Sequence, residues 1–250
     1  MKEKRVFIQL SYKGTSYSGW QIQPNAYTVQ EEIETALTKL YNEKVAIVGC
    51  GRTDTGVHAT MYYCHVDLNQ DRFENKDLAY KLNGILSDNI AVQNILDVSN
   101  NAHARFDATQ RAYFYRLHFE KQPFNLESSF RFNQSGIPDF ELLQKAADLI
   151  TNYKAFYPFC KANTEVETYN CKIFYSYWEQ TTEGLKYHVS ANRFLRGMVR
   201  MLVGMSLNVA TNKIKIEEVK KALDNQTRLH VAWSVPPHGL FLSDVKYPYL

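Results

Sequence analysis

Residues 51–59 read Gly-Arg-Thr-Asp-Thr-Gly-Val-His-Ala, and this stretch decides the fold expected of the N-terminal part of the chain. The residues before it, 45–48, and after it, 61–66, are rich in β-branched and aromatic side chains, so both flanks read as β-strands. Glycines in and beside the stretch permit a tight turn between them. The sequence therefore predicts a strand-flanked loop that holds Asp54 and Arg52 rigidly, as many active sites do. A solvated turn would use the same Asp, Thr and Gly residues, so local chemistry leaves both interpretations open.

Two known motifs share residues with this loop. Gly51 and Gly56 have the spacing of a phosphate-binding P-loop, but Val57 stands where that loop has lysine, which excludes it. The run Asp-Thr-Gly at 54–56 matches aspartic proteases, which need two such aspartates sharing one proton. No second Asp-Thr-Gly or Asp-Ser-Gly occurs in the chain, so a protease site would require a dimer.

Length and charge set wide limits. The 250 residues can form one large domain or two lobes. The 29 Lys and Arg barely exceed the 26 Asp and Glu, so net charge alone does not indicate a nucleic-acid partner. Aromatic residues are plentiful, with 17 Tyr, 14 Phe and 3 Trp. We expect most of them in a β-rich core and a few as platforms for stacked bases.

The cysteines and the N-terminus indicate an intracellular chain. Cysteines at 50, 64, 160 and 171 lack Cys-x-x-Cys spacing, and Cys64 and His65 would point to opposite faces of a strand. We therefore expect buried, reduced thiols and no zinc site. Met1–Arg5 leads directly into a strand at Val6–Tyr12, and no apolar run approaches the length of a membrane span. The sequence predicts a cytoplasmic protein.

Periodicity predicts an α+β order of elements. Thr28 and Glu31 form a capping box that opens a helix with Ile33, Leu37 and Leu40 on one face. A second helix carries Leu78, Leu82 and Ile85, and a strand follows at 90–98. The second half predicts strands near 111–120, 170–178, 184–192 and 240–247, and helices near 139–150, 194–210 and 216–224. This order indicates two ferredoxin-like lobes, at 1–105 and 106–250, each an antiparallel sheet with helices on one face.

Further short motifs occur in register along the chain. They are Tyr12-Lys13-Gly14-Thr15, Gly19-Trp20-Gln21, His103-Ala104-Arg105-Phe106, Asn192-Arg193-Phe194-Leu195, Met198-Val199-Arg200 and Gly239-Leu240-Phe241-Leu242. Together with residues 51–59, they resemble the TruA-type tRNA pseudouridine synthases from end to end. The resemblance implies two lobes facing across a central cleft, usually in a homodimer. It also implies isomerisation of uridine to pseudouridine in the tRNA anticodon stem-loop, at tRNA positions 38, 39 and 40.

The resemblance assigns the chemistry to Asp54. Isomerisation breaks the ribose bond to N1, turns the uracil and joins C5 to the ribose, so one carboxylate can serve as nucleophile or base. No redox or phosphoryl step occurs, and we expect neither a metal nor another cofactor. By the resemblance, Arg200 pairs with Asp54 and keeps it ionised. The spacing of Arg193, Arg196 and Arg200 predicts one basic helix face, with the first two as phosphate contacts.

Other residues are implied to contact the substrate. Arg52 is the expected wedge that fills the space left by a flipped uridine, because its guanidinium can stack on bases. Tyr113 corresponds to the tyrosine that lies against the target base, and Leu242 to an apolar residue near it. Arg105 and Lys13 are candidates for backbone contacts.

The chain departs from the family pattern in two places. Residues 154–159 read Lys-Ala-Phe-Tyr-Pro-Phe, where most relatives have an Asp-Phe-Thr-Ser-Phe type of sequence, so Tyr157-Pro158 replaces small hydroxyl residues. Residues 123–135 lack the Tyr-Trp pair that is usual after Pro-Phe. Both departures concern substrate contacts, because the aspartate stretch is intact. Two alternative functions therefore stay open: a non-catalytic RNA-binding paralogue and a dimeric aspartic protease.

Overall fold

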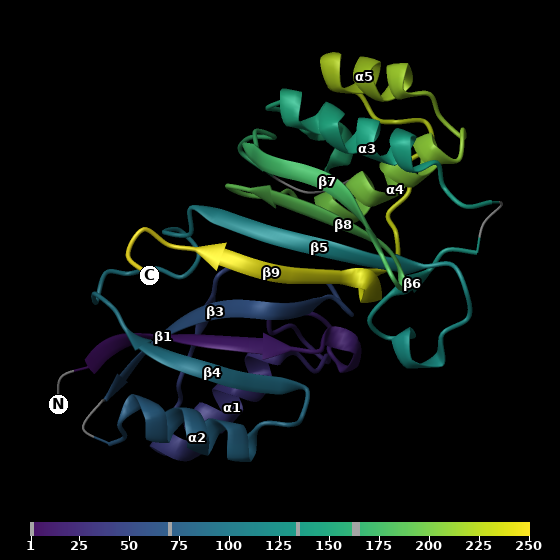
Figure 1. The fold of residues 1–250 in the computed structure, drawn as a ribbon. Helices are drawn as coiled ribbons and strands as arrows, with labels where there is room; N and C mark the ends of the chain where they lie inside the picture. Colours follow the sequence, from purple (N-terminus) through teal and green to yellow (C-terminus); the bar gives the residue numbers. More distant parts are fainter. Residues whose placement is uncertain (1–2, 70–71, 134–135, 162–165) are drawn as a thin grey trace. The chain divides into compact units, whose positions relative to one another are not determined.

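A computed structural model describes residues 3–69, 72–133, 136–161 and 166–250 of the chain (Figure 1). They group into two compact units. Unit 1 comprises Met1–Thr109 and Phe241–Leu250, and unit 2 comprises Gln110–Leu240. The sequence predicts lobes at 1–105 and 106–250, with the closing strand in the second. Residues 241–250 group with unit 1 in the structure, and the division into two lobes stays a prediction.

Unit 1 is a sheet with two helices. Its elements are β1 (Glu3–Tyr12), α1 (Val29–Tyr41), β2 (Val48–Gly49), β3 (His58–Asn69), α2 (Asn75–Ile85), β4 (Ile90–Asp97) and β9 (Leu240–Lys246). The strand order is β4-β1-β3-β9, with β2 paired to β3. β1 runs antiparallel to β3 and β4, whereas β9 runs parallel to β3. The sheet is therefore mixed, whereas the sequence predicted an antiparallel sheet.

The helices of unit 1 follow the apolar periodicity of the sequence. Thr28 caps α1 by accepting a hydrogen bond from the Glu31 backbone N–H at 3.3 Å, as the capping pattern predicts. Ile33 and Leu37 on α1 are fully buried. α2 buries its own apolar pair at positions 78 and 82. Ile85 was expected in the core, but it is exposed because α2 ends there and Leu86 takes the buried position.

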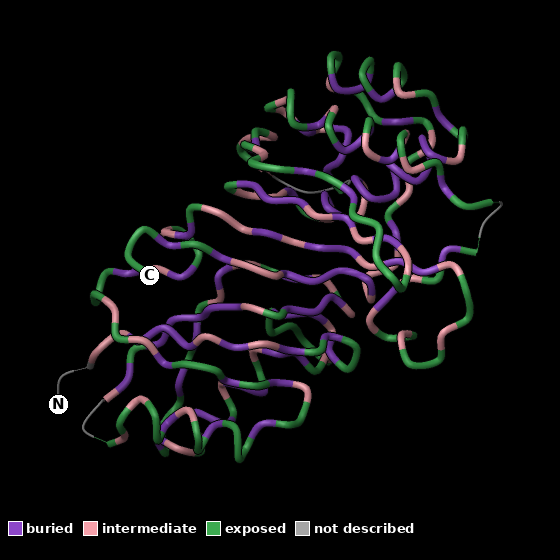
Figure 2. Tube along the Cα trace, in the orientation of Figure 1, coloured by how far each residue is buried: buried purple, intermediate pink, exposed green. Residues whose placement is uncertain are grey.

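Unit 2 has the same kind of architecture. Its elements are β5 (Gln110–His118), β6 (Phe130–Arg131), α3 (Phe140–Leu149), β7 (Ile173–Thr181), β8 (Gly184–Ala191), α4 (Met198–Ala210) and α5 (Ile216–Asp224). The order β5-β8-β7 is antiparallel, and β6 adds a short parallel pairing to β5. Tyr115 and Tyr187 are fully buried on one face of this sheet. In Figure 2, β8 is mostly buried or intermediate, while β7 is mostly exposed.

The described residues thus form five α-helices and mixed sheets. The longest helices, α1 and α4, have 13 residues each. A membrane span needs about 20 apolar residues. Accordingly, none of the helices in the described part of the chain is long and apolar enough to cross a membrane.

Candidate active site

Asp54 lies on a loop, residues 50–57, that joins β2 to β3 and is named the aspartate loop here. The loop closes on itself where the Val57 backbone N–H donates to the Asp54 carbonyl at 3.1 Å, and Gly56 next to it has a φ of 77°. The preceding strand is shorter than predicted: only Val48–Gly49 pair with β3, and residues 45–47 are irregular. The predicted strand–turn–strand unit is present, with most of its pairing on the β3 side.

The N-terminal motifs hold the backbone of the aspartate loop. Trp20 donates its backbone N–H to the Thr53 carbonyl at 3.2 Å, and the hydroxyl groups of Tyr12 and Thr53 lie 2.8 Å apart. Gly19, at a φ of 92°, comes so close that a Cβ there would lie 2.6 Å from the Thr53 oxygen. The motif glycine is therefore required by both backbone conformation and space.

Aromatic rings form a buried floor beneath the loop. The rings of Trp20 and Tyr62 stack with centroids 4.0 Å apart, and the ring of Tyr12 meets Tyr62 edge-on at 5.5 Å. The Tyr62 hydroxyl donates to the Gly51 carbonyl, and burial raises its pKa well above the usual value. The hydroxyl therefore stays protonated and remains a donor to the loop backbone at neutral pH.

The aspartate loop alternates between buried and accessible side chains. Thr53 and Val57 are buried, whereas Arg52 is exposed and Asp54 is half-buried. A half-buried carboxylate on a fixed backbone can reach a ligand and still be oriented by the protein. The structure thus brings Arg52 and Asp54 together on one loop, as the sequence predicts.

His58, the first residue of β3, follows the aspartate loop and has a structural role. Its Nδ1 accepts a hydrogen bond from the Gly14 backbone N–H at 3.0 Å, and its ring stacks on Phe241 at 4.5 Å. His58 is buried, so its imidazole serves the packing of the fold. β9 pairs here with the start of β3, so that Ala59 faces Leu242 in the register. Leu242 is almost fully buried, and its contact with a substrate base stays a prediction.

Arg105 lies in an exposed stack of side chains in unit 1. Its guanidinium carbon is 5.5 Å from the Phe106 ring centre, and that ring stacks on His103 at 4.3 Å. His103 Nδ1 accepts from the backbone N–H groups of both Arg105 and Phe106. Phe106 is 74 % exposed, which is unusual for so large an apolar side chain. The sequence does not predict a role for Phe106, because periodicity alone does not separate an exposed aromatic side chain from one in the core.

A buried carboxylate in α1 also escaped the sequence analysis. Glu32 accepts hydrogen bonds from the Tyr17 hydroxyl at 2.5 Å, the Tyr27 hydroxyl at 2.9 Å and the Ser87 backbone N–H at 2.7 Å. Burial alone would raise the pKa of Glu32, but these hydrogen bonds outweigh it and hold the pKa below its usual value. Glu32 therefore ties α1 to the segments around Tyr17 and Ser87.

Tyr113 and Arg200 belong to unit 2. Tyr113 on β5 is half-buried and meets the Phe194 ring edge-on at 5.2 Å. Alternation along β5 puts Tyr113 and Tyr115 on the same face of the sheet. Tyr115 is fully buried and its hydroxyl donates to the Pro236 carbonyl at 2.8 Å, so Tyr115 packs in the core of unit 2.

Arg200 stands in the first turn of α4. Its Nε donates to the Val235 carbonyl at 2.6 Å, which fixes the side chain between α4 and the segment after α5. Burial chiefly lowers the pKa of His238, and the Arg200 charge lowers it further. His238 is therefore held neutral beside this arginine.

The expected basic helix face is wrong in part. α4 begins at Met198, because Gly197 adopts a left-handed backbone with a φ of 72°. Arg193 and Arg196 precede the helix and do not share a helical face with Arg200. Since Asp54 lies in unit 1 and Arg200 in unit 2, their ion pair stays a prediction.

The two departures from the family pattern have different structural settings. Tyr157 packs edge-on against Tyr169 at 5.0 Å and lies under the Arg228 guanidinium at 4.6 Å, within unit 2. In the stretch 123–135, Phe124 is fully exposed and Leu126 is largely exposed, while residues 134–135 lie outside the described residues. The first departure is therefore built into unit 2, and the second presents apolar side chains to solvent.

Potential metal ligands do not gather among the residues that the structure describes. Cys50, Cys64, Cys160 and Cys171 are buried free thiols. Within residues 3–69, 72–133, 136–161 and 166–250, no three His, Cys, Asp or Glu side chains group so as to hold a metal ion.

Comparisons with known proteins identify the family of the chain. The family model described as tRNA pseudouridine synthase matches residues 9–107 and 153–248, leaving out the stretch that contains 123–135. The chain is 42 % identical to tRNA pseudouridine synthase A of Parabacteroides distasonis over 98 % of its own length and 96 % of the relative. It is 40 % identical to that of Azobacteroides pseudotrichonymphae over 98 % and 97 %, and 34 % identical to that of Bacillus subtilis over 97 % and 99 %. The chain belongs to the tRNA pseudouridine synthase family, and this membership displaces the protease alternative.

Proposed function

We propose that this chain converts uridine to pseudouridine in the anticodon stem-loop of tRNA, with Asp54 as its single catalytic carboxylate. The observation that carries the proposal is the aspartate loop. In a chain of this family, Asp54 is half-buried on a backbone held by Trp20, Tyr12 and close-packed glycines. The reaction class is isomerisation, and the proposed place of action is the cytoplasm, where tRNA is available.

The proposed chemistry needs one carboxylate. The C1′–N1 bond breaks, the uracil turns, and a C1′–C5 bond forms. C5 loses its proton and N1 gains one, so substrate and product have the same formula. Asp54 would act as nucleophile or base on the ribose or the uracil, a role that an ionised carboxylate can fill without a cofactor.

Arg52, Tyr113 and Arg200 are proposed to support this step in different ways. Arg52, exposed on the aspartate loop, would occupy the space that the target uridine leaves in the stem. Tyr113 would lie against the flipped base, and Arg200 would pair with Asp54 and keep it ionised. These roles require the two units to face each other across a cleft, and they form part of the proposal. A homodimer is proposed on the same basis.

The test is chemical mapping of pseudouridine in tRNA incubated with the purified protein. Wild type should produce a new signal in the anticodon arm. Asp54→Asn should produce none and should still bind tRNA, because binding depends mainly on phosphate contacts spread over basic residues. Asp88→Asn, an exposed carboxylate of unit 1, is the matched control and should keep the signal.

Each contrary outcome has a distinct meaning. Binding without any pseudouridine signal from wild type would identify a non-catalytic RNA-binding paralogue. Pseudouridine formation by Asp54→Asn would remove Asp54 from the catalytic role while leaving the family assignment in place.

A further inference from the structure

One face of the sheet in unit 2 carries exposed aromatic rings among cationic side chains. In an antiparallel sheet, residues paired across neighbouring strands lie on the same face. His188 on β8 pairs with Phe114 on β5 and with Tyr177 on β7, so these three side chains share a face. Tyr115, Tyr187 and Trp178 occupy the other face and are buried. This face is named the open face here. It carries Phe114, which is buried, and Arg116 on β5, Lys186 and His188 on β8, and the exposed Tyr175 and Tyr177 on β7.

The aromatic rings of the open face are both exposed and fixed in place. Tyr177 is 41 % exposed, and its ring stacks on His188 at 4.8 Å with an interplanar angle of 12°. Tyr175 is 37 % exposed, with its ring 5.8 Å from that of Tyr177. Phe174, the extra residue at a bulge in β7, is also exposed. A row of rings held on a strand can accept stacked bases at little conformational cost.

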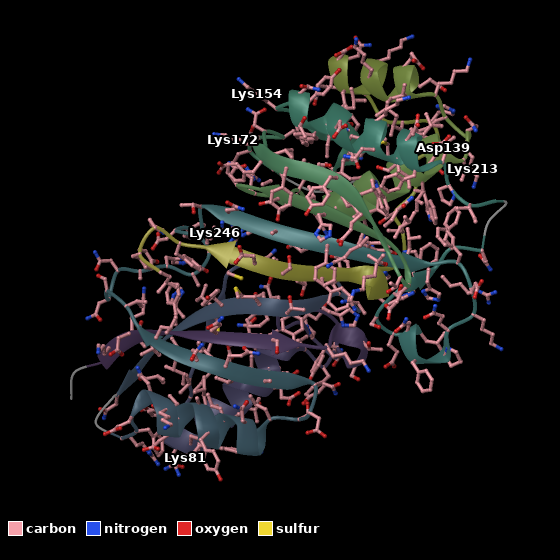
Figure 3. All side chains as sticks on the ribbon, in the orientation of Figure 1. Lys81, Asp139, Lys154, Lys172, Lys213 and Lys246 are labelled. Atoms are coloured by element: carbon pink, nitrogen blue, oxygen red, sulfur yellow. The ribbon has the colours of Figure 1, made fainter. Side chains whose placement is uncertain are left out.

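Positive charge surrounds these rings. Lys186 Nζ lies 4.5 Å from the Phe114 ring centre, and the Arg116 guanidinium carbon lies 5.2 Å from the same ring. Lys172, labelled in Figure 3 near the start of β7, has its Nζ 5.6 Å from the Phe174 ring. Glu179 adds a carboxylate to this face, with its Oε2 2.7 Å from His188 Nε2. Lys186, Arg116 and Lys172 thus place cationic groups next to the rings, where they can attract an anionic ligand.

We propose that the open face binds unpaired nucleotides of the tRNA substrate. Bases would stack on Tyr175 and Tyr177, and the adjoining phosphates would contact Lys186 and Arg116. The surface is separate from the position of Tyr113, which pairs with buried Val189 and so lies on the other face. That the bound RNA is tRNA follows from the proposed function. That the ligand stacks its bases on aromatic rings follows from the residues of the open face alone.

The chemistry of the face favours RNA over a protein partner. Charged side chains alternate with the rings, so the face lacks the continuous apolar patch that a stable protein interface buries. Unpaired nucleotides are favoured over a duplex, since only splayed bases offer their π-faces to aromatic side chains.

Equilibrium binding of a tRNA transcript tests the proposal. We would use Asp54→Asn as the background, so that turnover does not complicate the measurement. Adding Tyr177→Leu should weaken binding about ten-fold, within the range for loss of one stacked base. Tyr177→Phe keeps the ring and should bind as the background does. Tyr80→Leu, the same change at an 82 % exposed site on α2, is the control and should have no effect.

The charges are tested through salt dependence. Lys186→Gln should lower the slope of log affinity against log salt by about 0.7–0.9, the loss of one phosphate contact. Lys220→Gln, an exposed lysine on α5, should leave the slope unchanged. Photocrosslinking of a 4-thiouridine transcript to wild type should label the peptide that spans β7 and β8, and this measurement decides the matter if Tyr177→Leu does not fold.

Two outcomes would overturn the proposal. One is unchanged affinity of Tyr177→Leu together with no crosslink to β7 or β8. The other is a shift of Tyr177→Leu from dimer to monomer in sedimentation with unchanged affinity per protomer, which would make the open face a contact between copies of the chain. Neither result depends on whether wild type forms pseudouridine, which the mapping experiment with Asp54→Asn decides.

Discussion

Replacing Gly19 with alanine should push the backbone of the aspartate loop away from residue 19, because the added Cβ would collide with it. Gly19 has a φ of 92°, in the region that side chains disfavour by about 1–2 kcal/mol. An added Cβ would also lie 2.6 Å from the Thr53 backbone oxygen, and backbone cannot move aside as a flexible side chain can. Relieving that contact would break the Trp20–Thr53 hydrogen bond, which adds about 0.5–1.5 kcal/mol. We expect a loss of roughly 2–3 kcal/mol in the free energy of unfolding.

The effect on activity should exceed the effect on folding. Asp54 follows Thr53 directly, so a shift of about 1 Å in the loop can lower the rate on the order of 100-fold. The assays are urea unfolding and the single-turnover rate of pseudouridine formation at saturating protein. Gly84→Ala is the matched control: Gly84 lies inside α2 with no atom within 4 Å of the added Cβ. That change should be neutral or stabilise by up to about 1 kcal/mol, because alanine favours a helix. Wild-type stability and rate in Gly19→Ala would refute the reasoning.

Three further predictions follow from the site and its surroundings. Arg52→Lys should slow modification of a uridine in a paired stem more than that of a uridine in a loop, because Arg52 acts while the base unstacks. Arg200→Lys should slow both reactions similarly. If the ratio of the stem rate to the loop rate in single-turnover assays is the same for the two variants, their roles are not separate. Because the pKa of Glu32 is lowered in the folded state, its stabilisation is present above the usual pKa of 4.5 and is lost as pH falls through the folded value. Glu32→Gln should therefore cost about 2 kcal/mol at pH 7 and flatten the acid side of the urea-midpoint profile, whereas an unchanged profile would show that other groups control it. Activity should persist in EDTA when polyamines keep the tRNA folded, and restoration by one specific metal after loss would argue against metal-free chemistry.

Local signals in the sequence predicted most elements within a few residues. The Thr28 cap and the buried pair Ile33 and Leu37 illustrate this, because capping and helical periodicity depend on near neighbours alone. The start of α4 was misplaced, since an apolar pattern continues across Gly197 whether or not its backbone is helical. The parallel pairing of β9 was missed for a different reason: a strand's partner is set by the whole topology and not by its own residues.

The parts of the candidate site that lie within sequence motifs could be predicted from the sequence. Residues 51–59 identified Asp54 and Arg52 on one loop, and the structure bears out that they share it. The reason for Gly19 required coordinates, because only they show how close its backbone comes to Thr53. The exposed ring of Phe106 required them too, since composition predicts aromatic residues in the core.

The placement of β9 in unit 1 has a consequence for the order of events during synthesis. His58, which follows the aspartate loop, stacks on Phe241, and the Tyr247 hydroxyl donates to the Ala104 carbonyl at 2.6 Å. Unit 1 therefore cannot complete its sheet until residues 241–250 leave the ribosome, after the whole of unit 2. At about 5–20 residues per second, the first 109 residues wait on the order of ten seconds for their last strand. The nascent chain would thus hold an unfinished aspartate loop until residues 241–250 have been made and can pair with β3.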